Sequence, residues 1–142
     1  MSEYYNSLAR SLNEAIEHTQ EKKRLQVTQS TKNQIDDIMN EIVNNMKNIF
    51  DKNLRQVILF GSYARGEQEE YSDIDVMVLV DFSDEELRQY NNAIAEITTD
   101  ISIKYGIHPS IIDKNYQHFH KWSPYLPFYR NVKTEGVEFY AA

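Results

Sequence analysis

The chain has 142 residues, with 15 lysines and arginines against 22 aspartates and glutamates, and a formal net charge of −7 at pH 7. This length suits one domain with one core, and the negative charge argues against bulk binding to nucleic acid or anionic lipid. Because the chain has no cysteine, disulfides and thiolate zinc sites are excluded. No stretch approaches the ~20 apolar residues of a membrane-spanning helix, and the start lacks a signal-peptide core, so we expect a cytoplasmic protein.

The N-terminal segment is predicted to be an amphipathic helix followed by a linker. The apolar side chains that recur there at helical spacing are Tyr5, Leu8, Ala9, Leu12, Ala15 and Ile16. The segment HTQEKKR at 18–24 has no apolar period. We therefore expect residues 1–27 to stand apart from a domain over residues 28–142. The sequence leaves open whether this first helix folds back, dimerises or binds a partner.

A second, better-marked helix is expected to follow the linker. Thr31 and Gln34 have the spacing of a capping box. The apolar residues after them recur at helical intervals as far as Phe50. This helix should therefore begin near Thr31 and lay one face against the core.

Two short apolar runs then follow, VILF at 57–60 and IDVMVLV at 74–80. They are too short for typical helices and rich in β-branched residues, so we expect strands. Ser83 and Glu86 form a second capping box, which predicts a long helix. A third strand at 107–113 would run parallel to the second, with that helix as the crossover. The expected fold is α/β, a small sheet flanked by helices, and the aromatic tail should add loops, a short helix and a final extended piece.

The stretch GSYARGEQEEYSDID at 61–75 carries the candidate site. Gly61 follows the first predicted strand, where glycine lets the backbone approach a ligand, and exposed N–H groups with the Ser62 hydroxyl can hold an anion. Asp73 and Asp75 stand one residue apart at the start of the second strand. Their carboxylates should project from one face, roughly 6.6 Å apart along the chain. Hard oxygen ligands of this kind suit Mg²⁺, which completes its shell with water and substrate phosphates.

These residues, each next to a predicted strand, resemble the signature of the nucleotidyltransferase superfamily related to DNA polymerase β. GSYARG followed by SDIDVMVLV is most similar to the minimal nucleotidyltransferases of prokaryotes, one-domain proteins often encoded beside a small helical partner of the HEPN class. The resemblance covers about residues 30–113 and implies the polymerase-β-like fold, here with an extra N-terminal helix. It also implies that Gly61 and Ser62 hold the triphosphate of ATP. Asp73 and Asp75 would bind Mg²⁺.

One position departs from this resemblance. Active members usually add a third carboxylate from the neighbouring strand, and the corresponding segment here has Ser110 at that position. Asp113 is acidic but lies three residues further on, which on a regular strand is the opposite face. Either a bulge at Pro109 changes the register or the third ligand is absent. Without a base near the attacking hydroxyl, proton transfer would slow by orders of magnitude.

The roles of Arg65 and the histidines stay open. By the resemblance, Arg65 would lie near the nucleotide or support the loop, but a surface arginine paired with the acids of GEQEE is equally consistent with the sequence. His108 shares strand parity with Ser110, although a lone histidine there is more often exposed structure. His118 and His120 form an H-x-H without a further ligand nearby in sequence, which favours surface or packing roles.

Three functions are consistent with these features. The first is Mg²⁺-dependent transfer of AMP from ATP to a hydroxyl; by the resemblance, this would be a tyrosine of a HEPN ribonuclease toxin, with the chain as antitoxin. The second is an antitoxin that masks its partner by contact and keeps a residual nucleotide site, which Ser110 favours. The third, adenylation of an aminoglycoside, is disfavoured because those enzymes generally add a helical substrate domain.

The aromatic tail either covers the sheet or anchors a partner. The oligomeric state stays open, and a homo-oligomer is one of the possibilities.

Overall fold

The computed structural model describes residues 2–69 and 71–142, with side chains at 6–17, 31–69 and 71–142. The chain divides into two compact units, Met1–Asp37 and Ile38–Ala142. None of the helices in the described ranges combines the length and the apolar character needed to cross a membrane.

One continuous helix, α1, runs from Ser2 to Phe50. The prediction of two helices joined by a linker is therefore wrong, because the backbone at 18–24 is helical and Thr31 lies inside the helix. The segment HTQEKKR has no apolar face, but it contains neither proline nor glycine and is rich in good helix formers. The separation of residues 1–27 from the rest stays a prediction, and the side chain of Tyr5 lies outside the described residues.

A four-stranded sheet in the order β3-β2-β1-β4 forms the centre of the second unit. Its strands are β1 (Leu54–Phe60), β2 (Ile74–Val80), β3 (Pro109–Asn115) and β4 (Val137–Ala141). The β1 strand pairs antiparallel with β2 and with β4, whereas β2 and β3 run parallel. This confirms the α/β fold with a small mixed sheet and the parallel arrangement of the second and third strands.

After α1, this unit contains one longer helix, α4 (Asn91–Tyr105), and several short ones. The short helices are α2 (Ser62–Arg65), α3 (Asp84–Leu87), α5 (Tyr116–Trp122) and α6 (Pro127–Glu135), with 3-10 turns η1 (Asp51–Asn53) and η2 (Arg88–Tyr90). The capping box at Ser83 is confirmed, since its Oγ accepts from the Glu86 N–H at 3.2 Å. The single long helix predicted after it is instead interrupted by η2, where the Tyr90 ring packs on Phe50 and Phe82.

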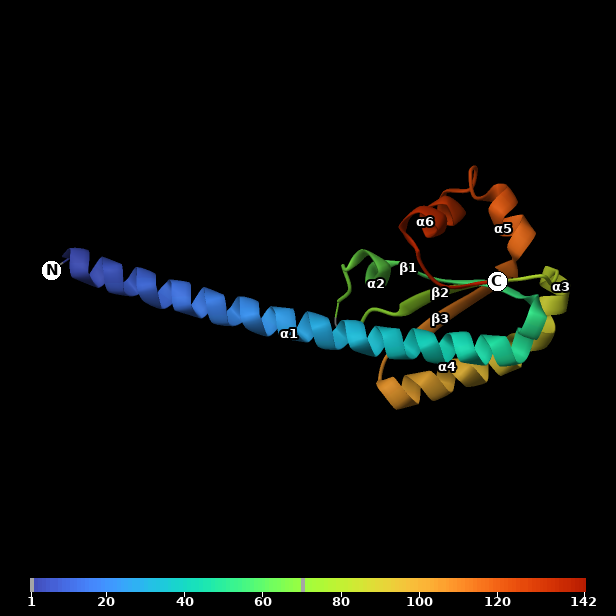
Figure 1. Cartoon of the computed structure of the whole chain (residues 1–142), viewed down its shortest axis with the longest axis horizontal. Coiled ribbons are helices and arrows are strands. Elements are labelled where there is room, and N and C mark those ends of the chain that lie inside the picture. Colours follow the sequence, from blue (N-terminus) through green and yellow to red (C-terminus); the bar gives the residue numbers. More distant parts are fainter. Residues whose placement is uncertain (1, 70) are drawn as a thin grey trace. The chain divides into compact units, whose positions relative to one another are not determined.

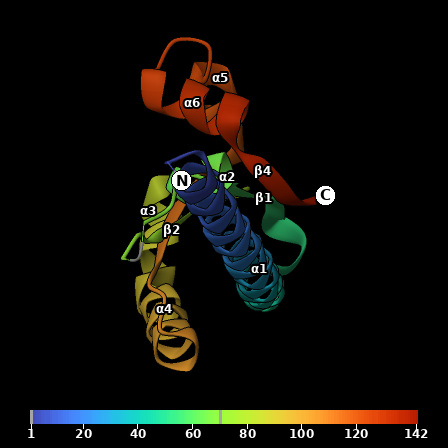
Figure 2. The same cartoon turned by 90° about the vertical axis from the view of Figure 1, so that its left-hand side faces the viewer.

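Helices cover both faces of the sheet. The last part of α1 and α4 lie on one side, and α5 and α6 lie on the other (Figures 1 and 2). Met77 and Leu79 of β2 belong to the core cluster that includes Phe119 of α5 and Val132 of α6. Because both faces are covered, every residue of β2 from Val76 to Val80 is buried.

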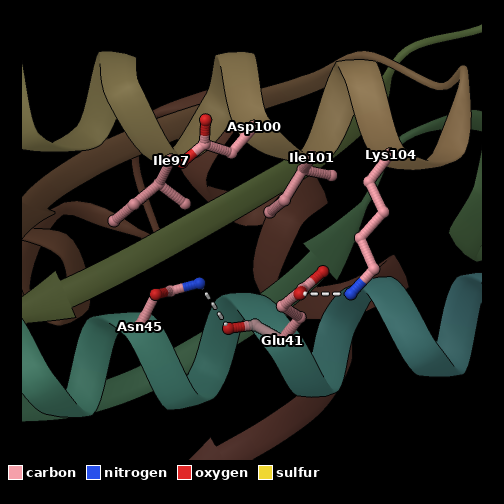
Figure 3. A pocket seen from close by; sticks show the side chains of 6 residues that line it. All are labelled: Glu41, Asn45, Ile97, Asp100, Ile101 and Lys104. Carbon is pink, nitrogen blue, oxygen red and sulfur yellow. Dashed lines mark hydrogen bonds and ion pairs between the residues drawn. The ribbon is translucent and has the colours of Figure 1, made fainter.

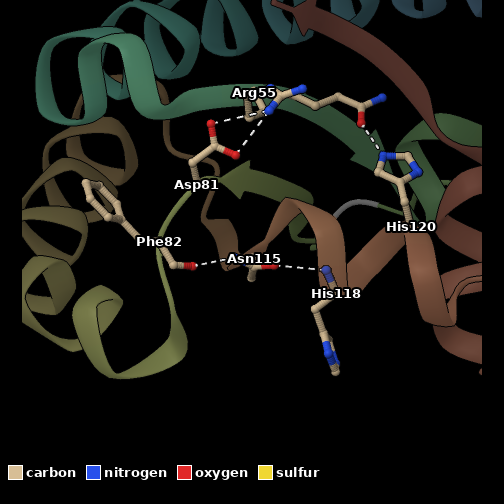
Figure 4. Close-up of polar contacts among 7 residues, drawn as sticks. Arg55, Asp81, Phe82, Asn115, His118 and His120 are labelled. Atoms are coloured by element: carbon tan, nitrogen blue, oxygen red, sulfur yellow. Dashed lines mark hydrogen bonds and ion pairs between the residues drawn. The ribbon is translucent and has the colours of Figure 1, made fainter.

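Polar contacts fix the edges of this arrangement. Lys104 Nζ lies 2.9 Å from Glu41 Oε1 and joins α4 to α1 beside a small pocket (Figure 3). Asn115 Oδ1 accepts from the His118 N–H at 2.9 Å and so caps α5 (Figure 4). His120 Nε2 lies 3.0 Å from Gln56 Oε1, so the structure places this ring in a contact between α5 and β1.

Candidate active site

Gly61 joins the end of β1 to the turn α2 in a conformation that favours glycine. Its φ is 75° and its ψ is −155°, and a side chain there would be strained. A Cβ placed on Gly61 would also lie 3.2 Å from Asp75 Cγ and would collide with Asp75 Oδ2. The first N–H groups of α2 have no partners within so short a helix. The structure thus places the Asp75 carboxylate directly against the turn at which α2 begins.

Asp75 lies at the mouth of β2, opposite Phe60 of β1. Burial and the negative charge of Asp73 raise the pKa of the Asp75 carboxyl, while Arg65 lowers it. Asp73 is exposed just before the strand. Burial and the charge of Asp73 also raise the pKa of Tyr63 in α2. The charge of Asp73 therefore acts on both Asp75 and Tyr63, and the Asp75 carboxylate lies against the turn at Gly61.

This pair of carboxylates fits a magnesium ion. Mg²⁺ usually takes one or two protein carboxylates and keeps water or phosphate oxygens in its other positions. Within the parts of the chain that the structure describes, no group of three or more His, Cys, Asp or Glu side chains gathers into a closed metal site. The arrangement therefore fits a metal shared with a phosphate ligand better than a structural metal.

The register of β3 places Ser110 beside Asp75. Asp75 pairs with Ser110 and Val78 pairs with Asp113, with no shift of register between β2 and β3. No bulge occurs at Pro109, so Ser110 shares the face of Asp75 and Asp113 lies on the opposite face. The structure does not bring Asp113 to the other candidate residues.

Asp113 is instead a half-buried acid on the other face of the sheet, paired with Val78 of β2. Burial raises the pKa of its carboxyl, and the charge of Asp84 acts in the same direction. Its Oδ2 atom is buried and has no hydrogen-bond partner. A polar atom in this state costs stability, which makes Asp113 a candidate for stabilising substitution.

Arg65 combines features of both interpretations offered by the sequence. Its Nε lies 3.0 Å from Glu67 Oε2, the expected partner from GEQEE, and its Nη1 lies 3.4 Å from Glu135 Oε2 of α6. Exposed pairs of this kind contribute about 0–1 kcal/mol, so a phosphate ligand can displace them. The positive charge of Arg65 acts on Asp75, which places it within electrostatic reach of the carboxylate pair.

A pocket of about 190 Å³ opens beside this turn. Its lining residues are Phe60, Gly61, Arg65, Phe128, Asn131, Val132 and Glu135. Four of these seven residues come from α6, and no sequence motif signalled that α6 would lie near Gly61. His108 is not among the residues that line this pocket. Its Nδ1 lies 3.1 Å from Ser102 Oγ.

Known proteins match this chain over most of its length. Residues 39–129 match the model of the nucleotidyltransferase domain. "Putative protein adenylyltransferase MJ0604" of Methanocaldococcus jannaschii is 35% identical over 105 residues, which are 70% of this chain and 92% of that protein. "Putative protein adenylyltransferase MJ0141" of the same organism is 34% identical over 105 residues, which are 74% and 98% of the two chains.

Two solved structures share the fold. A toxin–antitoxin complex with AMP-PNP has a TM-score of 0.50 at 22% identity, covering 72% of this chain and 73% of that one. A mutant of the toxin–antitoxin pair MntA–HpeT has a TM-score of 0.51 at 20% identity, with the same coverage. At these identities the likeness extends to the fold alone.

Proposed function

Since this chain belongs to the nucleotidyltransferase family, we propose that it transfers AMP from ATP to a hydroxyl group of a protein. The observation that carries the proposal is the close approach of the Asp75 carboxylate to Gly61, at the start of the turn α2. The matches cover nearly the whole length of the two archaeal relatives. The names of these relatives support protein adenylylation as the reaction.

In this proposal each candidate residue has one role. The backbone at Gly61 and the Ser62 hydroxyl donate hydrogen bonds to the triphosphate, and Arg65 exchanges its glutamate partners for a phosphate oxygen. Asp73 and Asp75 hold Mg²⁺ by their carboxylate oxygens. When bound, Mg²⁺ would neutralise negative charge on the phosphate oxygens of ATP.

The transfer forms a bond between the acceptor oxygen and the α-phosphorus of ATP and breaks the bond to pyrophosphate, which leaves. The proton of the acceptor hydroxyl must also leave. Ser110, on the face of Asp75, cannot take that proton at neutral pH, so water would have to. We therefore expect slow turnover, sustained by positioning and charge neutralisation.

We propose a HEPN-type protein as the partner and a tyrosine as the modified residue. Two proteins of the same fold were solved within toxin–antitoxin complexes, one of them with AMP-PNP, which supports this kind of partner. A second candidate function is an antitoxin that neutralises its partner by contact alone, and Ser110 in the position of an acid favours it. Both functions are expected in the cytoplasm.

Mass spectrometry separates the two functions. The chain is incubated with ATP, Mg²⁺ and the product of the adjacent gene, and both proteins are weighed. A mass gain of one AMP on the partner, absent with Asp75→Asn, is the expected result. Complex formation without any adduct would support contact neutralisation, and MgATP binding that survives Asp75→Asn would refute the site.

A further inference from the structure

The helical pair α5 and α6 differs in charge from the rest of the chain. Residues 114–134 contain no aspartate or glutamate, and their basic residues are Lys114, Lys121, Arg130 and Lys133. The whole chain carries a net charge of −7. This segment is therefore a basic island in an acidic protein, and it attracts negatively charged ligands locally.

The same segment exposes a cluster of large apolar side chains, which we name the aromatic turn. It consists of Trp122, Tyr125, Leu126 and Phe128, exposed by 39%, 71%, 42% and 47%. Trp and Tyr are the residues that most often dominate the binding energy of protein interfaces. These four side chains lie within seven residues, and the rings of Trp122 and Tyr125 contact each other, with 6.2 Å between their centroids.

The aromatic turn is held in a fixed shape. The opposite faces of α5 and α6 are buried in the core through Phe119 and Val132. The Leu126 N–H donates to the Trp122 carbonyl at 2.9 Å, and the buried Ser123 hydroxyl donates to the His120 carbonyl at 3.2 Å. The exposure of these rings is thus not a result of loose packing, and binding would cost little ordering entropy.

The aromatic turn is continuous with the candidate active site. The ring of Phe128 packs edge-on against Phe60, with 5.6 Å between the ring centroids. Phe128 also lines the pocket of about 190 Å³ beside Gly61 and Arg65. Since a cavity of about 150 Å³ admits benzene, this pocket is large enough for one phenol ring. A segment bound on the aromatic turn therefore reaches the pocket beside Gly61 and Arg65.

Two cations flank the aromatic turn. Lys121 Nζ lies 5.6 Å from the centroid of the Trp122 ring. Arg130 is exposed and follows Leu126 by one helical turn, and its N–H donates to the Leu126 carbonyl. Neither cation is paired with an acid among the described residues, so both are available to carboxylates of a partner.

We propose that the aromatic turn, with Lys121 and Arg130, is the docking surface for the acceptor protein, and that it binds an acidic, tyrosine-bearing segment of that protein. This inference rests on the proposed adenylylation for the identity of the occupant. Aromatic and basic side chains also suit single-stranded nucleic acid. The net charge of −7 and a reaction aimed at a protein hydroxyl favour the protein.

The test measures binding of the full chain, with MgATP, to an immobilised random copolymer of glutamate and tyrosine. A copolymer of lysine and tyrosine and a single-stranded oligonucleotide serve as the other ligands. We expect binding to the acidic copolymer that falls about tenfold or more with Tyr125→Ala, with Trp122→Ala and with Arg130→Glu. Ile103→Ala is the matched control, because Ile103 is 79% exposed on α4, on the other side of the sheet, and it should change binding by less than about twofold.

The outcomes separate this surface from the proposed function. Equal binding by wild type and the Tyr125→Ala variant, or a preference for the basic copolymer, would overturn the docking surface. Tighter, turn-dependent binding of the oligonucleotide would assign the surface to nucleic acid instead. If the acidic copolymer binds through the turn but MgATP does not bind, the adenylylation fails and the docking surface stands. Tyr125 is the most exposed of the four residues, so its variant keeps the test valid if Trp122→Ala unfolds.

Discussion

Replacing Gly61 with alanine tests whether its contact with Asp75 makes the nucleotide site. The φ of 75° and ψ of −155° belong to a region essentially restricted to glycine, so alanine should cost about 1–3 kcal/mol of unfolding free energy. The added Cβ would lie 3.2 Å from Asp75 Cγ and closer still to a carboxylate oxygen. Because Asp75 is only half-buried, its side chain can rotate away while the domain stays folded.

The displaced carboxylate is expected to weaken MgATP binding by about 10- to 100-fold, the usual effect of disturbing the surroundings of a metal. Gly66→Ala is the matched control. Gly66 has φ 71° and ψ 22°, so alanine costs about 1–2 kcal/mol there, but its Cβ would meet nothing within 4 Å. Urea denaturation reports the stability of both variants, and calorimetric titration reports their affinity for MgATP.

Only the Gly61 variant should lose affinity for MgATP. If both variants lost it equally, the effect would come from the backbone of the turn and not from Asp75. If neither lost it, the turn and the carboxylate pair would not act together, and the proposed site would be wrong.

Three further substitutions test the acids and the serine of the sheet. The pKa of Asp75 is raised by burial and by Asp73, so the folded chain holds the proton more tightly, and stability falls as pH rises through the raised value. Asp75→Asn should therefore raise the thermal midpoint at pH 7 in EDTA while it abolishes MgATP binding; a lowered midpoint would contradict this sign. Asp113 also has a raised pKa through burial, and Asp113→Asn should raise the midpoint at pH 7 without changing AMP transfer, whereas a loss of transfer would place Asp113 in the site. Ser110→Asp puts a carboxylate beside Asp75 and should speed single-turnover AMP transfer by about 10²-fold; an unchanged rate would mean that proton transfer is not limiting.

The strand-based part of the site could be predicted because it depends on local rules. Side chains alternate along a strand, so the position of Asp75 at the start of β2 fixes the face on which it lies. A parallel crossover with unbroken register then places Ser110 beside Asp75 and excludes Asp113. Each of these steps uses residues within one strand or two neighbouring strands.

The α6 part of the site could not be predicted, because it depends on tertiary packing. Arg65 reaches Glu135 across 70 residues of sequence, and nothing in either segment signals the other. The continuity of α1 was missed for a different reason. The segment at 18–24 loses its apolar period, yet its helix propensity remains, and the absence of a packed face was wrongly read as the absence of a helix.

The composition of the site restricts the kind of acceptor that this chain can modify. Ser110 lies beside Asp75, and in the parts of the chain that the structure describes no third acid gathers with Asp73 and Asp75, so we expect little rate from proton transfer. Positioning, which can supply about 7–11 kcal/mol, must replace it. An acceptor held only in the pocket beside Gly61, which at about 190 Å³ has room for one ring, is positioned by few contacts. A protein acceptor bound on the adjoining aromatic turn gains much more, so the missing acid and the exposed rings both favour a docked macromolecular substrate over an aminoglycoside.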